Sequence, residues 1–348
     1  MGVRRGRPLR RGESAVPDDA EGRRLRVVQR WRGLDEIPAD WGRCVVTIGV
    51  FDGVHRGHQQ LIGRAVEAAR ERGVASVLMT FDPHPMEVVR PGSHPAQLTT
   101  LSRRAELAEE LGIDVFCVVP FTPEFMRLSP DRYAHEILVE RLHVAEVVVG
   151  ENFTFGKKAA GTVDMLRSIG DRFGFAVQGL NLLAEHAVTF SSTYIRSCVD
   201  AGDVAAAADA LGRPHRVEGV VVRGDGRGRG LGFPTANVAP PMYAAIPADG
   251  VYAAWFTVLD SGAPVDGMEV GRRYGAAVSV GTNPTFSGRN RTVEAFVLDA
   301  KADLYGQHVA VDFVTRLRGM EKFDSVEALV SAMHGDADRA RELLAGEQ

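Results

Sequence analysis

The sequence predicts an α/β chain of two domains, in which a parallel sheet covered by helices is followed by a small antiparallel β-barrel with a C-terminal helix. From residue 45 to residue 212, apolar strand-like segments alternate with segments of helical spacing. This alternation is typical of a parallel sheet with helices on both faces. After residue 212, apolar residues instead alternate along short segments separated by Gly, Pro and Asp, which is typical of antiparallel strands.

The composition is that of a soluble globular protein, with 348 residues, 45% of them hydrophobic and 25% charged. The net charge of −4 gives no general reason to expect nucleic acid or a membrane as a partner. No window is long and apolar enough to span a bilayer. The three cysteines are far apart, so neither a disulfide framework nor a metal knuckle is indicated. These features predict a cytoplasmic protein, and they leave its oligomeric state open.

Residues 1–26 form a basic tail with paired arginines among Gly, Pro and Asp and almost no apolar residues. A segment with so little apolar surface is predicted to be disordered. No apolar stretch follows the arginine pairs, so they do not indicate an export signal.

The first candidate site lies between an apolar run at residues 45–50 and a helical pattern that ends at Gly73. A strand, tight turn and helix in this order direct free N–H groups and the positive end of the helix dipole at a bound phosphate. His55 and His58 flank Gly57 in the turn, and both imidazoles can donate hydrogen bonds to phosphate oxygens. Donors that are fixed before reaction stabilise charge on a five-coordinate phosphorus. The pattern favours nucleotidyl transfer, and the alternatives are a zinc pair or a plain polar turn.

The rest of the first domain continues the same alternation, and ligands are expected at the carboxyl ends of its strands. The predicted strands cover residues 75–81, 115–121, 146–149 and 175–178, and the predicted helices cover residues 102–111, a segment capped at Ser129, residues 162–173 and two short segments between 192 and 211.

Loops at those strand ends hold further candidates. Phe81-Asp82-Pro83-His84-Pro85 is a rigid turn, and a second loop places Phe153 and Phe155 on one side, next to Asn152. Taken alone, such aromatic residues are more typical of core packing than of a ligand platform. Ser191-Ser192-Thr193-Tyr194-Ile195-Arg196 puts hydroxyls in a first helical turn and an arginine one turn later. This is either a second anion-binding segment or an ordinary N-cap with a solvated arginine.

The second domain follows a linker predicted at Arg213-Pro214-His215. Five strands are expected over residues 217–222, 250–259, 274–280, 292–298 and 308–313, and a final helix from about Ser325. Glycine recurs at every second position from Gly224 to Gly232, just before Pro234-Thr235-Ala236-Asn237. Such a segment either wraps a polyphosphate or forms a surface loop or an RNA-binding Arg-Gly patch.

Two further features of this domain suggest kinase chemistry. In an extended backbone the oxygens of Thr235 and Asn237 point the same way, and they offer two hard ligands for Mg²⁺. Glu294 lies on a predicted strand and faces the same side as Phe296 and Leu298. A carboxylate in that place is a candidate general base, and an exposed edge-strand glutamate is the alternative. No Gly-x-x-x-x-Gly-Lys-Ser/Thr motif occurs, so a P-loop kinase is excluded.

From about residue 27 to the C-terminus, the sequence resembles the bacterial bifunctional riboflavin kinase/FAD synthetases. The stretch from Gly49 to His58 resembles the His-x-Gly-His signature of the nucleotidyltransferase superfamily. The resemblance implies a Rossmann-like FMN adenylyltransferase domain over residues 27–212 and a riboflavin kinase domain over residues 213–348. Further similarity lies in Ser191–Arg196, Pro234–Asn237, Ser279–Phe286 and Asp303–Gly306.

This resemblance implies two reactions on small molecules, with Mg²⁺ as cofactor. The second domain would make FMN from riboflavin and ATP, and the first would make FAD from FMN and a second ATP with release of pyrophosphate. The residues implied in catalysis are His55, His58 and Glu294. In the adenylyltransferase site, the implied contacts with ATP are Gly49, Phe51, Gly57, Asn152, Ser192, Thr193 and Arg196, and those with flavin are Phe81, Asp82, His84, Phe153 and Phe155. In the kinase site, the implied contacts with ATP are Gly228, Gly230, Gly232, Pro234, Thr235 and Asn237, of which Thr235 and Asn237 also bind Mg²⁺. The alternatives are a different nucleotidyltransferase with a ligand-binding barrel and a non-enzymatic RNA- or flavin-binding protein.

Overall fold

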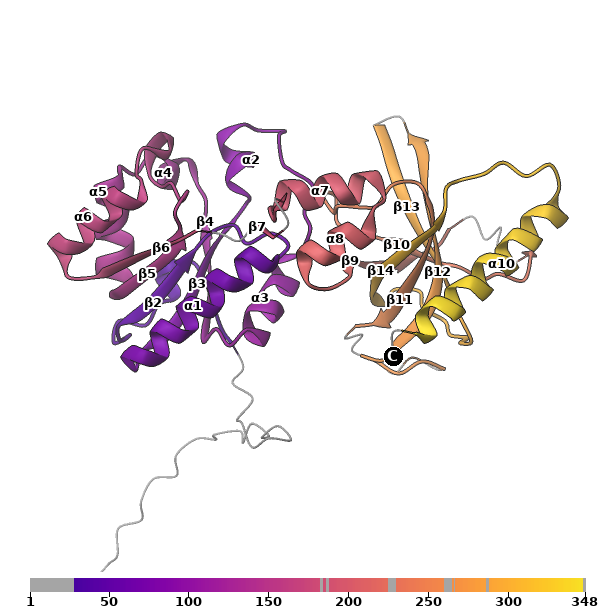
Figure 1. The fold of residues 1–348 in the computed structure, drawn as a ribbon, viewed down its shortest axis with the longest axis horizontal. Helices are drawn as coiled ribbons and strands as arrows, with labels where there is room; N and C mark the ends of the chain where they lie inside the picture. The colour runs from indigo at the N-terminus through magenta and orange to yellow at the C-terminus, as the bar shows by residue number, and fades with distance from the viewer. Residues whose placement is uncertain are drawn as a thin grey trace, which may run out of the picture.

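The computed structural model describes residues 28–181, 184–185, 188–224, 230–259, 265, 267–285 and 288–346. The expectations for the tail at residues 1–26 and for Gly228 lie outside these residues. Figure 1 shows a helix-covered sheet on one side, a barrel on the other, and helices α7 and α8 between them. The predicted α/β fold class is confirmed.

The first domain is built on a six-stranded sheet in the order β1-β4-β3-β2-β5-β6, with all neighbours parallel. From β2 the chain moves outward through β3 and β4, and it then returns to β5 on the other side of β2. The carboxyl ends of β2 and β5 therefore flank the switch point of the sheet, where open α/β sheets bind ligands. The strands are Gln29–Arg32 (β1), Cys44–Ile48 (β2), Ala75–Asp82 (β3), Val115–Pro120 (β4), Val144–Gly150 (β5) and Ala176–Leu180 (β6).

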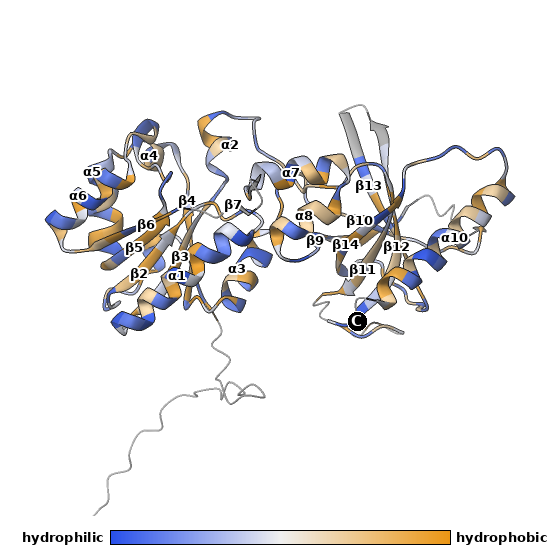
Figure 2. Cartoon of the chain, viewed as in Figure 1, coloured by the Kyte–Doolittle hydropathy of each residue, from blue (hydrophilic) through white to orange (hydrophobic). Residues whose placement is uncertain are grey.

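Both faces of this sheet are buried, because successive side chains of β2 enter opposite cores. Val46 and Ile48 join the cluster on one face, whereas Val45 joins the cluster on the other face with α1. Figure 2 shows the corresponding hydrophobic colour along the central strands. The helices are Arg56–Arg72 (α1), Pro85–Val89 (α2), Leu101–Glu110 (α3), Pro123–Met126 (α4), Pro130–Arg132 (α5), Val163–Phe173 (α6), Ser192–Ala201 (α7) and Val204–Leu211 (α8), with 3-10 turns at Leu34–Glu36 and Lys157–Ala159 and a π-helix at Tyr133–Arg141.

The second domain is a closed antiparallel barrel in the order β10-β13-β12-β11-β14-β9. Its interior is filled by one apolar cluster, and a second cluster joins its outer face to α10. Ser325 caps that helix by accepting a hydrogen bond from the N–H of Ala328. The elements are His215–Val222 (β9), Ala236–Ala239 (β10), Gly250–Val258 (β11), Arg273–Thr285 (β12), Gly288–Val297 (β13), His308–Arg318 (β14) and Val326–Ala345 (α10), and a separate two-stranded ribbon joins Ala184–Glu185 (β7) to Val188–Thr189 (β8).

The predicted linker at Arg213-Pro214-His215 joins the end of α8 to the start of β9, and its residues are held in place. His215 begins β9, is buried, and its Nε2 lies 2.7 Å from the carbonyl oxygen of Ala245. Arg213 donates to the carbonyl oxygens of Gly53 and Val54 at 2.5 and 3.1 Å. The junction between the domains is therefore part of the folded structure and braces the turn that follows β2.

Candidate functional site

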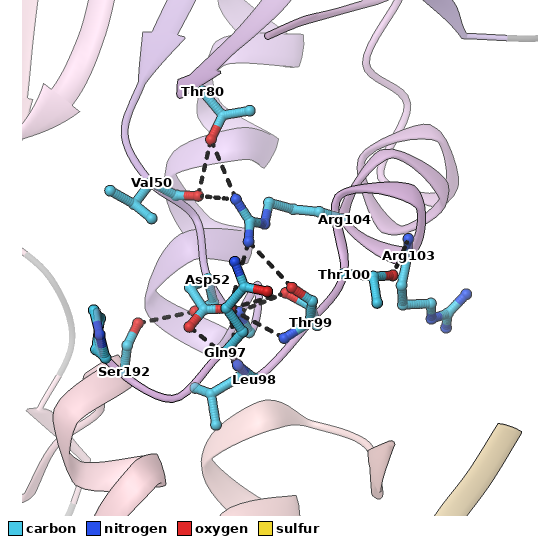
Figure 3. A network of polar contacts seen from close by, with 12 residues as sticks. Val50, Asp52, Thr80, Gln97, Leu98, Thr99, Thr100, Arg103, Arg104 and Ser192 are labelled. Carbon is cyan, nitrogen blue, oxygen red and sulfur yellow. Dashed lines mark hydrogen bonds and ion pairs between the residues drawn. The ribbon is translucent and has the colours of Figure 1, made fainter. Parts of the chain in front are cut away.

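Asp52 is the polar centre of the turn that follows β2. The Asp52 side chain is buried, and it accepts hydrogen bonds from the N–H groups of Leu98 and Thr99, each at 3.0 Å (Figure 3). Two guanidinium groups balance its charge, with Arg196 at 2.6 Å and the buried Arg104 at 3.5 Å. A buried carboxylate with such partners fixes the positions of the groups around it. Asp52 stood inside the motif but was not among the residues predicted for the site, and neither was Arg104.

His55 and His58 lie together at the start of α1, as the sequence predicted. His55 is the N-cap, and its Nδ1 accepts the N–H of His58 at 3.3 Å. Because Nδ1 is the acceptor, a neutral His55 carries its proton on Nε2. The two rings are stacked, with centroids 3.6 Å apart. Within the described part of the chain, the buried Nδ1 of His58 has no hydrogen-bond partner.

Both imidazoles are neutral at pH 7. Burial lowers the pKa of His55 to about 4, against the smaller opposing effect of Asp52. Burial lowers the pKa of His58 well below its usual value, and the positive charges of Arg104 and Arg196 act in the same direction. Neutral rings of this kind act on phosphate oxygens as fixed N–H donors rather than as cations.

The pKa of His55 makes folding stability depend on pH. Between pH 6.5 and about pH 4, the unfolded chain takes up a proton that the folded chain does not. The free energy of unfolding should therefore fall as the pH falls through this window, by up to about 3 kcal/mol. Urea unfolding of the wild type and of His55→Gln at neutral pH and at about pH 4.5 tests this. The wild type should lose more stability than the variant, and equal losses would contradict the lowered pKa.

The start of α7 is anchored to the same turn. Ser192 Oγ donates to the carbonyl oxygen of Asp52 at 2.8 Å, and Arg196 Nε donates to the carbonyl oxygen of Ala96 at 2.6 Å. Ser191 caps the helix by accepting the N–H of Tyr194. The two segments predicted to bind phosphate therefore meet at Asp52, although 144 positions separate Asp52 from Arg196 in the sequence.

The glycines of the turn allow close packing of its rings. A Cβ on Gly49 would lie 3.3 Å from the ring of Phe51, and one on Gly57 would lie 3.3 Å from the ring of His55. Phe51 itself is 1% exposed and belongs to the core. The ring of Phe51 is therefore not available as a surface for a nucleotide.

The residues predicted to contact flavin lie in two groups. Phe81 contacts the rings of Phe121 and Phe125, with centroids 5.5 and 5.9 Å away. His84 caps α2 by accepting the N–H of Met86, and Asp82 before it is exposed. Burial lowers the pKa of His84 to about 4.

The second group follows β5, where Asn152 is exposed. Phe153 and Phe155 are stacked with centroids 5.8 Å apart. Phe155 is 6% exposed and contacts Tyr133 in the core, whereas Phe153 is only partly buried. Phe153 is therefore the more accessible of the two rings.

The three predicted kinase residues meet on the outer face of the barrel. Asn237 on β10 is the direct register partner of Glu294 on β13, so their side chains lie on the same face. A Cβ on Gly224 would lie 2.5 Å from the amide of Asn237, so this close approach requires glycine. Glu294 and Thr235 are both partly exposed.

Three predicted residues of the glycine-rich segment lie in its described part and are exposed. Gly230 and Pro234 are exposed, and Gly232 is exposed with a φ of +86°. A positive φ of this kind favours glycine.

An interdomain cavity of about 1340 Å³ connects the two groups of predicted residues. It is lined by Thr193 and Arg196 of α7 and by Thr235, Asn237 and Glu294 of the barrel, among others. This volume exceeds that of ordinary small-molecule pockets.

Two alternatives can be compared with the described residues. Among them, no group of three or more His, Cys, Asp or Glu side chains is placed to hold a metal ion. The described residues therefore offer no third ligand of these types for a zinc ion bound by His55 and His58. None of the helices in this described part of the chain is long and apolar enough to cross a membrane.

A strand, a turn with two histidines and a helix at the switch point of a parallel sheet are typical of a nucleotidyltransferase, and here they are joined to a second domain with its own candidate site. Residues 37–194 match the FAD synthetase family, and residues 211–344 match the riboflavin kinase family. The chain belongs to the family of bifunctional riboflavin kinase/FMN adenylyltransferases.

Relatives with that name cover nearly the whole chain. The chain is 34% identical to the protein of Escherichia coli K12, over 91% of this chain and 97% of that protein. It is 34% identical to the protein of Bacillus subtilis, over 87% and 93% of the two chains. A crystal structure titled as a macrolide-efflux protein from Streptococcus pneumoniae is 30% identical and superposes with a TM-score of 0.79, covering 90% of this chain and 99% of that one.

Proposed function

We propose that the barrel domain phosphorylates riboflavin to FMN and that the sheet domain adenylylates FMN to FAD, with the residues described above in these roles. The two activities follow from the family to which the chain belongs. The observation that carries the assignment of residues is the convergence of the His55 turn and the start of α7 on Asp52. We place the domains at residues 27–212 and 213–348.

In the adenylyltransferase step, an oxygen of the FMN phosphate attacks the α-phosphorus of ATP. The bond from that phosphorus to the bridging oxygen breaks, and pyrophosphate leaves without a covalent enzyme intermediate. His55 and His58 donate hydrogen bonds to the α-phosphate oxygens as charge builds on them. Arg196 and the hydroxyls of Ser192 and Thr193 bind the departing phosphates. The backbone at Gly49, Phe51 and Gly57 and the side chain of Asn152 complete the ATP site.

The flavin of FMN binds at the ends of β3 and β5. Phe81 and Phe153 present partly buried rings there, and Asp82 and His84 lie in the loop after β3. Phe155 supports this surface from the core by stacking on Phe153.

In the kinase step, Glu294 accepts the proton of the terminal ribityl hydroxyl as that oxygen attacks the γ-phosphorus of ATP, and ADP leaves. Thr235 and Asn237 fit a Mg²⁺ ion, because both offer hard oxygen ligands and line the same cavity as Glu294. When bound, Mg²⁺ neutralises charge on the phosphates. The segment with Gly228, Gly230, Gly232 and Pro234 wraps those phosphates.

The test is incubation of the purified protein with riboflavin, Mg²⁺ and ATP, followed by chromatography of the flavins. FMN should appear first and FAD second. Unchanged riboflavin at saturating substrate would contradict the kinase assignment. A parallel reaction that starts from FMN tests the adenylyltransferase alone, and flat nucleic-acid titrations at low salt would exclude RNA binding.

A further inference from the structure

Residues 94–99 form a short segment between the catalytic turn and the kinase domain. On one side, Asp52 accepts the N–H groups of Leu98 and Thr99, and the carbonyl oxygen of Ala96 accepts Arg196 Nε. The hydroxyl of Thr99 also accepts the N–H of Gly53 at 3.0 Å. The position of this segment therefore sets the positions of Asp52 and Arg196.

The other side of the segment is held by the kinase domain, through the loop between β10 and β11. Gln97 donates its N–H to the carbonyl oxygen of Tyr243 at 2.5 Å, and its own carbonyl oxygen accepts the N–H of Ala245 at 2.8 Å. These two bonds form an isolated parallel bridge between Gln97 and Ala244. The kinase domain thus forms a single β-bridge with the segment that borders the adenylyltransferase site.

Three aromatic rings lie next to one another beside this β-bridge, those of Tyr243, His94 and His84. The ring of Tyr243 is stacked on His94, with centroids 4.1 Å apart and planes 10° from parallel. The ring of His94 lies 5.3 Å from that of His84, which caps α2 just after the Phe81 strand. Stacking of the Tyr243 and His94 rings contributes beyond simple burial and restricts the plane of the His94 ring. The ring of Tyr243, together with the contact of His94 Nδ1 to the carbonyl oxygen of Pro95 at 2.6 Å, therefore holds the His94 ring beside His84 in the flavin loop.

We propose that Tyr243, a residue of the kinase domain, is a positioning residue for the FMN adenylyltransferase site. It holds His94 and His84 in the orientation that receives the flavin of FMN. The proposal rests on the proposed function, which assigns the loop of His84 to flavin. It implies that the adenylyltransferase site is complete only in the two-domain chain.

The test compares Tyr243→Ala, Tyr243→Phe and Met242→Ala in the full chain. Tyr243→Ala removes the stacked ring but keeps the backbone carbonyl that accepts Gln97, so the fold of the segment is retained. The KM for FMN in FAD formation should rise about threefold to tenfold, with a smaller change in kcat. Tyr243→Phe keeps the ring and should restore the wild-type KM. Met242→Ala is the matched control, since Met242 is the neighbouring residue and is 88% exposed.

A double variant separates positioning from general support of the fold. If Tyr243 acts through His94, adding Tyr243→Ala to His94→Ala should raise the KM for FMN little further, because coupled residues are not additive. Riboflavin phosphorylation and the melting temperature should stay near wild type in Tyr243→Ala. An unchanged KM for FMN, or a parallel loss of both activities, would overturn the proposal. Failure of the wild type to convert FMN would instead contradict the proposed function.

Discussion

His58→Ala should lower FAD formation from FMN by about a hundredfold or more, because one fixed donor to the transition state is lost. The His58 ring lies between the stacked His55 and the edge of Phe51, and its Nδ1 has no partner in the described part of the chain. The ring is thus held in place by its neighbours, and its Nδ1 is not used in a hydrogen bond within the described residues. Riboflavin phosphorylation should continue, so that FMN accumulates when the variant is given riboflavin, Mg²⁺ and ATP.

The control for this variant is His135→Ala, which removes an imidazole that is 45% exposed from the π-helix. Both variants should be compared with the wild type by thermal unfolding, since His58 also packs against Phe51. If a folded His58→Ala protein makes FAD at the normal rate, the turn after β2 is not the catalytic element.

The parts of the fold with strong periodicity could be predicted from the sequence. The end of α1 at Gly73 follows from a left-handed residue with a φ of 65°. The edge strand β1 escaped prediction, because in Gln29–Arg32 only Trp31 is buried. The sequence predicted a helix that opens at Ser129, but not the π-type bonding of Tyr133–Arg141, since that bonding leaves no separate pattern in the sequence.

Some residues of the candidate site could also be predicted from the sequence, and others could not. His55, His58, Ser192 and Arg196 lie in local motifs whose spacing indicates phosphate chemistry, so they could be proposed before any contact was known. The role of Asp52 depends on contacts with Leu98, Thr99 and Arg196, which are 46, 47 and 144 positions away. Pairings over such separations are set by tertiary structure, and a single sequence carries no signal for them.

The contact of Tyr243 could be predicted from the sequence even less than those of Asp52. It lies in a loop of the kinase domain with no motif around it, yet its ring stacks on His94 of the other domain. Only the packing of the two domains brings these rings together. The boundary between the domains in sequence is thus not a boundary between the two sites.

Glu294→Gln should lower riboflavin phosphorylation by about a hundredfold to ten-thousandfold, if Glu294 is the general base. Glutamine keeps the size of the side chain and its place opposite Asn237 in the barrel, but it cannot accept the hydroxyl proton. The first domain has its own buried clusters. The variant should therefore fail on riboflavin and still convert supplied FMN to FAD at nearly the wild-type rate.

The matched control is Glu269→Gln, because Glu269 lies in the same domain with a side chain that is 73% exposed. A misfolded barrel would also be inactive, so thermal unfolding and the binding of riboflavin with Mg²⁺ and ADP must be measured on the same preparation. Unimpaired binding with lost phosphorylation would place the defect in proton transfer. Normal phosphorylation by a folded Glu294→Gln protein would remove Glu294 from the mechanism, and the proposed kinase site would then rest on Thr235, Asn237 and the glycine-rich segment.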